Sequence, residues 1–355
     1  MSRNAPHWRN LSRWLLPAIC GCLLAASWRA GAALPSSFAN PGPRVRVVVV
    51  EDAGALDAFR PRPAIIRDMV DRGITNLTGN ASLTTAWLSL VKTQDIVGIK
   101  VFSSPGPHSG TRPAVVAAVV EGLLAAGVPA KNIVVWDKEL VDLRLAGFFD
   151  LADRYGIRVV GSVAAGWDEK TFYESEIIGN LVYGDFEFGM KTNGTGRKSF
   201  VSKLVSRDLT KIININPLLN HNLAGVSGNL YSLATGSVDN LIRFESSSGR
   251  LARAIPEIYA LEAVGDKVVL NITDALIGQY EGGEHGLLHY STILNQLRFS
   301  KDPVALDMLS IQELDRQRQA TKAPVVVPNL DLYETAALLQ LGVNDLRRIQ
   351  VDKIR

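Results

Sequence analysis

The chain has 355 residues, of which 47% are hydrophobic and 21% are charged, a composition that is typical of a folded globular protein and excludes a disordered one. The formal net charge is +3, but residues 1–33 hold four of the 38 basic residues and none of the 35 acidic ones, so the remainder carries 34 basic against 35 acidic residues, about −1. This balance gives no support to a nucleic-acid partner, which would require a basic surface.

The N-terminus predicts a signal peptide over residues 1–33. A basic stretch at 3–13 precedes an apolar run at 14–26, and small residues suited to cleavage follow at 30–33. The apolar run is shorter than the roughly 20 residues that a membrane-spanning helix needs, and an uncleaved anchor is the alternative. We therefore expect Sec-type export to the periplasm or the medium, a mature chain that starts near Leu34, and no membrane span after cleavage.

Both cysteines, Cys20 and Cys22, lie inside the predicted signal peptide. The mature protein is therefore expected to hold neither a disulfide nor an iron–sulfur cluster, because both need cysteine thiols. The sequence points to no particular cofactor.

The chain from residue 44 to residue 161 predicts strands and helices in alternation. Apolar runs rich in β-branched residues predict strands at 44–50, 96–101, 132–137 and 156–161. Helices are predicted at 61–72, 80–92, 113–126 and 140–155, and the third begins with Pro113 and is closed by Gly127. This order predicts βαβ units with right-handed crossovers.

The middle of the chain is less regular. Residues 162–200 are polar, with glycines and scattered aromatic residues, and we interpret them as a β-rich insertion or a lid. A strand is then predicted at 211–216 and ended by Pro217. A polar turn and a glycine-rich loop are expected from there to residue 240.

The C-terminal part predicts further strands and helices. The expected elements are a helix at 252–263, a strand at 266–274, a second glycine-rich loop at 278–286, a helix that begins with Asp302 as N-cap and Pro303 as its first residue, a helix at 331–341 and a last strand at 349. The sequence therefore predicts one α/β domain over 34–355, with a mostly parallel sheet flanked by helices and a partly irregular insertion.

Polar side chains follow several of the predicted strands. Because the carboxyl ends of parallel strands meet at one edge of a sheet, the loops after Lys100, Asn216 and Asp274 are expected to form one cleft. His221 is the candidate catalytic acid/base, with Asp274 as its partner or as a second acid. A hydrogen-bonded structural histidine and a turn aspartate are the alternatives.

The same cleft is expected to bind a small anionic molecule. Arg112 and the helix start behind it could hold a carboxylate or phosphate, although a simply capped helix start is the alternative. The candidate ligand-binding residues are Lys100, Thr111, Arg112, Asn222, Ser227 and Asn229.

A metal site is a separate hypothesis. His285 and His289 are four residues apart and could lie on one helical face, with Glu281 and Glu284 nearby. Two histidines and a carboxylate are sufficient for a divalent metal, whereas a surface loop is the simpler interpretation.

Several of these segments occur in the order of a known family. The segments are Val97–Lys100, Pro105–Pro113, Asn220–Val226, Glu281–Gly283 and Ser300–Asp307. Together they resemble the family described as domain of unknown function 362, over roughly residues 95–315. Many relatives have lysine before the histidine, where this chain has Asn220. Some relatives add iron–sulfur ligands, which a cysteine-free mature chain lacks.

A fainter similarity is to the nickel-pincer lactate racemase family. Thr111–Pro113, Asn220-His221 and Ala224–Gly228 look like that family's substrate loop and histidine segment. The resemblance implies an acid/base role for His221 and a substrate-anchoring role for Arg112. Tyr231 stands where that family has its cofactor-bearing lysine, so the pincer cofactor is not expected here.

Three classes of function are compatible with these observations. The first is an exported enzyme acting on a small anionic molecule, with His221 as acid/base. The second is a periplasmic small-ligand-binding protein that uses the same cleft without catalysis. The third is a metal-dependent enzyme centred on His285 and His289.

Overall fold

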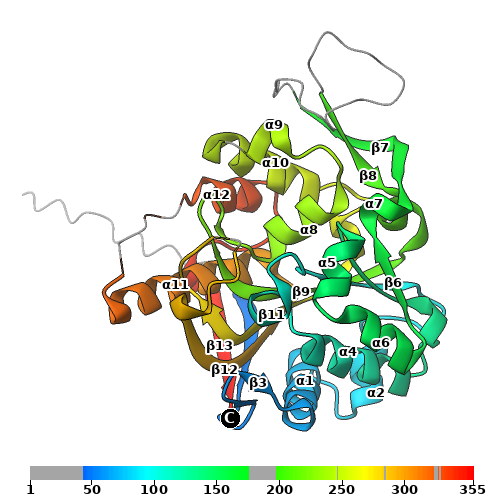
Figure 1. Cartoon of the computed structure of the whole chain (residues 1–355), viewed down its shortest axis with the longest axis vertical. Helices are drawn as coiled ribbons and strands as arrows, with labels where there is room; N and C mark the ends of the chain where they lie inside the picture. Colours follow the sequence, from blue (N-terminus) through cyan, green and yellow to red (C-terminus); the bar gives the residue numbers. More distant parts are fainter. Residues whose placement is uncertain (1–42, 176–196, 246, 284, 324–326, 328) are drawn as a thin grey trace, which may run out of the picture. The chain divides into compact units, whose positions relative to one another are not determined.

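The computed structural model describes residues 43–175, 197–245, 247–283, 285–323, 327 and 329–355 (Figure 1). The predicted signal peptide lies outside these residues. Among the helices of the described part, none is both long and apolar enough to cross a membrane.

A large mixed sheet organises the described chain. Its strand order is β13 (Ile349–Ile354), β1 (Val45–Glu51), β12 (Ser291–Ser300), β11 (Val268–Gln279), β9 (Lys211–His221), β4 (Val97–Val101), β5 (Ile133–Asp137) and β6 (Arg158–Gly161). All neighbours are parallel except β12, which is antiparallel to both β1 and β11. The short β10 (Gly225–Val226) folds back onto the end of β9. The predicted α/β fold with a mostly parallel sheet is confirmed.

Helices cover both faces of this sheet. The first face packs against α1 (Pro63–Thr78), α2 (Leu83–Leu88), α4 (Pro113–Ala125), α5 (Leu140–Leu145) and α6 (Phe148–Tyr155). The second face packs against α8 (Asn229–Ser237), α9 (Ile242–Glu245), α10 (Ser248–Tyr259), α11 (Pro303–Thr321) and α12 (Asp331–Leu338). Smaller elements are β2 (Leu56–Asp57), β3 (Arg60–Pro61) and α3 (Gly106–Ser109).

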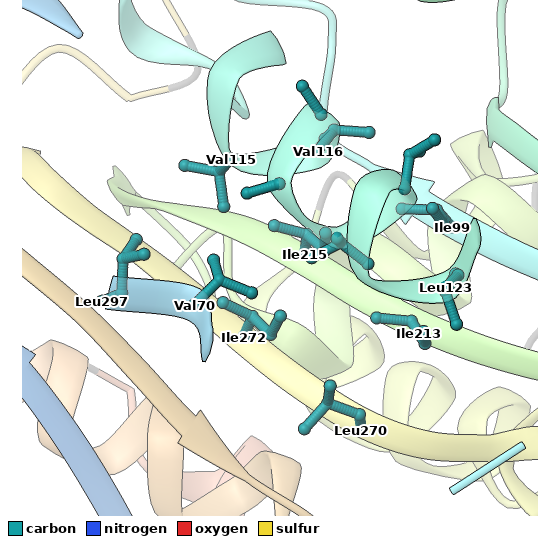
Figure 2. Close-up of a cluster of buried hydrophobic side chains, with 14 of the residues drawn as sticks. Val70, Ile99, Val115, Val116, Leu123, Ile213, Ile215, Leu270, Ile272 and Leu297 are labelled. Atoms are coloured by element: carbon teal, nitrogen blue, oxygen red, sulfur yellow. The ribbon is translucent and has the colours of Figure 1, made fainter. Parts of the chain in front are cut away.

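The two faces are set by strict alternation along β9. Ile213 and Ile215 belong to the core beneath α4, where Figure 2 shows them below Val115 and Leu123. Because successive side chains of a strand point to opposite faces, the intervening Asn214 points toward α8 instead. Along β9 the α8 face therefore carries the polar Asn214 and Asn216, whereas the α4 face carries the apolar Ile213 and Ile215.

Pro217 does not end the strand as predicted. β9 runs on to His221, because Pro217 lies where neither neighbouring strand needs its missing N–H. Pairing with β4 stops at Ile215, and the register with β11 shifts directly after Pro217.

The prediction of a glycine-rich loop after His221 is wrong for the second half of that segment. Asn229–Ser237 forms α8, and all nine of its residues are buried. Burial of the whole helix explains why the segment holds almost no charge.

The remaining differences are local. The predicted helix at 140–155 is two helices that part at Gly147, whose φ is 86°. The strand β12 was not predicted, because its half-buried residues show no continuous apolar run. The described part of the predicted insertion forms α7 (Ser162–Ala165) and an antiparallel pair, β7 (Trp167–Glu174) and β8 (Lys198–Ser202), while residues 176–196 lie outside the described residues.

Candidate functional site

The loops that follow β4, β9 and β11 meet at one edge of the sheet, as predicted. The Thr111 hydroxyl donates to the Ile215 carbonyl of β9 at 2.8 Å and accepts from the Phe102 N–H at 2.9 Å. Thr111 is fully buried, so its hydroxyl joins the end of β4 to the middle of β9 and has no contact with solvent.

Arg112 and Asp274 form a closed ion pair at this edge. Arg112 Nη1 lies 2.8 Å from Asp274 Oδ1, and the Arg112 backbone N–H donates to Oδ2 at 3.0 Å. The second guanidinium nitrogen donates to the His108 carbonyl at 3.0 Å. Arg112 is 2% exposed and Asp274 is 0% exposed. The pair fastens the start of α4 to β11, and this geometry does not favour Arg112 as an anion anchor or Asp274 as a catalytic acid.

Lys100 is held in the same way on the opposite face. Its Nζ donates to Asp137 Oδ1 at 2.8 Å, to Ser232 Oγ at 2.9 Å and to the Val101 carbonyl at 2.5 Å, which uses all three N–H groups. Burial lowers the pKa of Lys100, and the neighbouring Asp137 carboxylate opposes that shift. Lys100 therefore joins β4, β5 and α8.

A chain of amide side chains connects β9 to the start of α8. Asn216 Nδ2 donates to Asn214 Oδ1 at 2.8 Å and to Asn229 Oδ1 at 3.2 Å. Asn229 is 1% exposed, and Ser227 is fully buried. These contacts place Asn229 in the helix start, where it has no access to an outside ligand.

Asp307 of α11 completes this network. Its carboxylate accepts from the Asn229 N–H at 2.7 Å, from Asn229 Nδ2 at 2.9 Å and from the Leu230 N–H at 3.0 Å. A carboxylate from another helix thus caps the N-terminus of α8. Burial is the main cause that raises the pKa of Asp307 to about 7, while these hydrogen bonds act to lower it.

His221 is the last residue of β9 and lies on the α8 side. Its Nδ1 accepts from the Ala224 N–H at 2.9 Å and the Leu223 N–H at 3.2 Å. The ring lies against Tyr231, with ring centroids 4.2 Å apart, and the residue is 8% exposed. Because Nδ1 is an acceptor, the neutral ring carries its proton on Nε2.

The Ala224 carbonyl is held in turn by α12. The hydroxyl of the buried Tyr333 donates to it at 2.8 Å. The turn that orients His221 is therefore fixed by β9, β10 and α12.

A row of neighbouring side chains leads from His221 to Tyr231, then to Glu245 and then to Lys138. The Tyr231 hydroxyl lies 3.4 Å from Glu245 Oε1. Lys138 follows β5, is partly exposed, and donates from Nζ to the Asp239 carbonyl at 3.0 Å. Burial lowers the pKa of Lys138, while Glu245 and three further carboxylates nearby oppose that shift.

Asn222 is the one exposed member of the predicted ligand-binding set. Its Oδ1 accepts from Asn220 Nδ2 at 3.0 Å, and the side-chain Oδ1 of Asn220 accepts from buried Arg318. Arg318 also pairs with Glu281 at 3.1 Å, so α11 ties the second glycine-rich loop to β9.

The predicted helical face with two histidines is wrong. His285 lies in a bend and His289 in a short 3₁₀ helix (Leu288–Tyr290), and both are exposed. Glu284 lies outside the described residues. Within the described part of the chain, no three His, Cys, Asp or Glu side chains are grouped so as to hold a metal ion.

Sequence reasoning missed several residues of this region as site candidates. They are Lys138, Tyr231, Glu245 and Asp307. Asn214 and Asn216 alternate with isoleucines in β9, and that alternation is a sequence signal for a polar face. No comparable local pattern marks Glu245 or Asp307, because their partners are distant in sequence.

Comparison with known families gives one match. A family model described as "Domain of unknown function (DUF362)" matches residues 97–312, which is more than half of the chain and contains the residues from Lys100 to Asp307 discussed above. No curated protein gives a significant match. The resemblance to the nickel-pincer lactate racemases therefore gains no support.

Among solved structures, similarity is found to the crystal structure of a Thermotoga maritima protein, a Northeast Structural Genomics Consortium target. The TM-score is 0.39 and the sequence identity 12%, and the alignment covers 76% of this chain and 61% of that chain. This chain thus spans less than two thirds of the length of the protein it matches.

Proposed function

We propose that this chain, which belongs to the DUF362 family, is an enzyme that acts on a small anionic molecule at the carboxyl ends of β5 and β9, with His221 as a hydrogen-bond donor to the reacting molecule. The family match is to a domain of unknown function, so the proposal rests on the chemistry of this chain's own residues.

The observation that carries the proposal is the way His221 is held. Two backbone N–H groups point at Nδ1, at 2.9 and 3.2 Å, and the ring rests on Tyr231. In the neutral ring Nε2–H is then a fixed donor. A neutral imidazole held in this way can stabilise negative charge that develops on a substrate oxygen.

This geometry refines the acid/base role that the sequence suggested. A base must offer a lone pair, and the lone pair of Nδ1 is already shared with Leu223 and Ala224. The role that we propose is therefore hydrogen-bond donation from Nε2 during the reaction. The reaction class is one in which negative charge builds up on a substrate oxygen, such as removal of the α-proton of a carboxylic acid by a solvent base while Nε2–H donates to the enolate oxygen.

A second candidate is the exported binding protein without catalysis. It is favoured by the closed pair of Arg112 and Asp274, which takes the predicted second acid out of the site. The two proposals differ in whether a bound anion is turned over.

The decisive variant is His221→Asn. Asparagine Oδ1 is bonded to Cγ, as histidine Nδ1 is, so it can still accept from the Ala224 N–H. The Nε2–H donor is lost. Loss of one donor to a developing oxyanion lowers kcat by about 10²- to 10³-fold. We expect to observe this fall in kcat in a ¹H NMR assay that follows the exchange of solvent deuterium into the α-carbon of small hydroxy, keto and amino acids.

His289→Asn serves as the matched control, because it makes the same substitution at an exposed histidine outside the proposed site. The catalytic proposal is wrong if His221→Asn exchanges deuterium as fast as the wild type. Anion binding without turnover in the wild type would support the binding protein instead. ¹⁵N NMR of the wild type should show the Nε2–H tautomer of the neutral ring.

A further inference from the structure

Among the described residues, Lys100, Arg112 and Lys138 are cations at the carboxyl edge of the sheet; a fourth, Arg318, is buried and already paired with Glu281 and Asp315. An anionic ligand there needs a cation that is both reachable and not already neutralised. The three can be separated by their partners and their exposure.

Neither Lys100 nor Arg112 is reachable from outside, and each is already neutralised by a carboxylate. Lys100 is paired with Asp137 at 2.8 Å and Arg112 with Asp274 at 2.8 Å. Lys100 is 0% exposed and Arg112 2% exposed. To bind a ligand, either would have to abandon a buried carboxylate, which would remain charged and unpaired at a cost of several kcal/mol.

Lys138 differs from both. Its hydrogen bond within the described chain is to a neutral group, the Asp239 carbonyl, at 3.0 Å, and it forms no salt bridge with any described carboxylate. An ammonium group has three N–H donors, so two remain for a ligand. The residue is partly exposed, unlike Lys100 and Arg112.

Three of the four acidic groups around Lys138 are engaged elsewhere, and the fourth, the exposed Glu139, forms no salt bridge with it. Asp239 Oδ1 accepts from the Phe200 and Asn240 N–H groups, at 2.7 and 2.6 Å. Asp137 is neutralised by Lys100, and Glu245 lies beside the Tyr231 hydroxyl. These carboxylates hold the ammonium in place without closing an ion pair on it.

We propose that Lys138 is the cation that binds the anionic group of the ligand. The inference rests on the proposed function, since it names the anchor of the same site. The ligand class is a small carboxylate or phosphate. Its anionic group would bind Lys138, and another of its oxygens would lie over the Tyr231 ring and accept from His221.

The test is isothermal titration calorimetry of the mature chain with inorganic phosphate and with malonate as probes. Lys138→Met should weaken binding of the probe that binds by about 10- to 100-fold, as loss of a charged hydrogen bond implies. Lys138→Arg should retain most of the affinity. Phosphate and malonate in separate titrations distinguish the two ligand chemistries.

Lys131 gives a matched control. It is an exposed lysine at the amino end of β5, whereas Lys138 follows the carboxyl end of the same strand. Lys131→Met removes the same charge and should leave binding unchanged.

A measurement on the wild type does not depend on any variant folding. Acetic anhydride labelling followed by mass spectrometry should show that the bound probe protects Lys138 and leaves Lys131 reactive. Equal binding by Lys138→Met, or no protection of Lys138 while a probe binds, overturns the anchor and leaves the proposed function standing. If neither probe binds the wild type, the anchor and the small-anion proposal both fall.

Discussion

At the scale of single residues, the polar groups near the strand ends divide into those that hold the fold and those that can meet a ligand. Arg112 is neutralised by Asp274 and Lys100 by Asp137, and both pairs are buried. His221 and Lys138 sit at the ends of β9 and β5 with contacts to neutral backbone groups. A charged residue after a strand is therefore a site candidate only once its partner is known.

Asp307 gives a prediction at this scale. Its pKa is raised from 3.8 to about 7 in the folded chain, so between these values the folded state holds a proton that the unfolded state has lost. The contribution of Asp307 to the free energy of unfolding must then fall as pH rises from about 4 to about 7. Asp307→Asn removes this titration.

The measurement is urea unfolding of wild type and Asp307→Asn at pH 5 and at pH 8. The wild type should lose more stability than the variant between the two pH values. The other titrating groups are common to both proteins and cancel in the comparison. An equal loss in both proteins would show that Asp307 keeps its ordinary pKa in the fold.

At the scale of elements, close packing between helices and the sheet depends on glycines, which have no side chain at the points of contact. A Cβ at Gly228 would lie 2.2 Å from Asp307 Oδ1, and one at Gly236 would lie 2.2 Å from Lys100 Cε. α8 can therefore approach α11 and β4 only because these positions are glycine. The glycines that suggested a loop in the sequence serve helix packing instead.

Gly122 of α4 provides the element-scale prediction. A Cβ there would lie 2.3 Å from Nε1 of the buried Trp87, on α2. Overpacking of this kind costs about 1–3 kcal/mol, and the better helix propensity of alanine returns up to about 1 kcal/mol. Gly122→Ala should therefore lower the free energy of unfolding by about 1–2 kcal/mol in urea titrations.

Gly249 of α10 is the control, because a Cβ there would meet nothing within 4 Å. Gly249→Ala should be neutral or slightly stabilising. If Gly122→Ala is as stable as Gly249→Ala, α2 and α4 are not packed in contact through Trp87.

At the scale of the whole molecule, the sheet separates two environments. The apolar core under α4 lies on one face, and the amide network and His221 lie on the other, beside α8. The loops after β4, β9 and β11 meet at one edge of the sheet as predicted, whereas the side chains of Arg112 and His221 belong to opposite faces. The single cleft stays a prediction.

Export is the prediction for the whole chain. The basic and apolar pattern of residues 1–33 predicts cleavage near Leu34. Edman sequencing of protein from the periplasm or the medium should begin near this residue. Cytoplasmic protein that retains Met1 or Ser2 would contradict the prediction.

The sequence by itself determined what depends on local pattern. The β-branched runs predicted β1, β4, β5 and β6, because apolar runs of that length are buried strands in a parallel sheet. Asp302 and Pro303 predicted the start of α11, where Asp302 Oδ1 accepts from the Ala305 N–H at 2.8 Å. His221 was proposed from its place after a strand, whereas it is the last residue of β9, and its role stays a prediction.

Only the tertiary structure decided what depends on partners far apart in the chain. The cap of α8 comes from Asp307, 78 residues beyond Asn229, so no local pattern could show that the glycine-rich segment is a helix. Arg112 and Asp274 are 162 residues apart, and their neutralisation became visible only once β4 and β11 lay on either side of β9. Charge and hydrogen-bonding capacity are read from a sequence one residue at a time, whereas their availability to a ligand depends on which groups the fold has already paired.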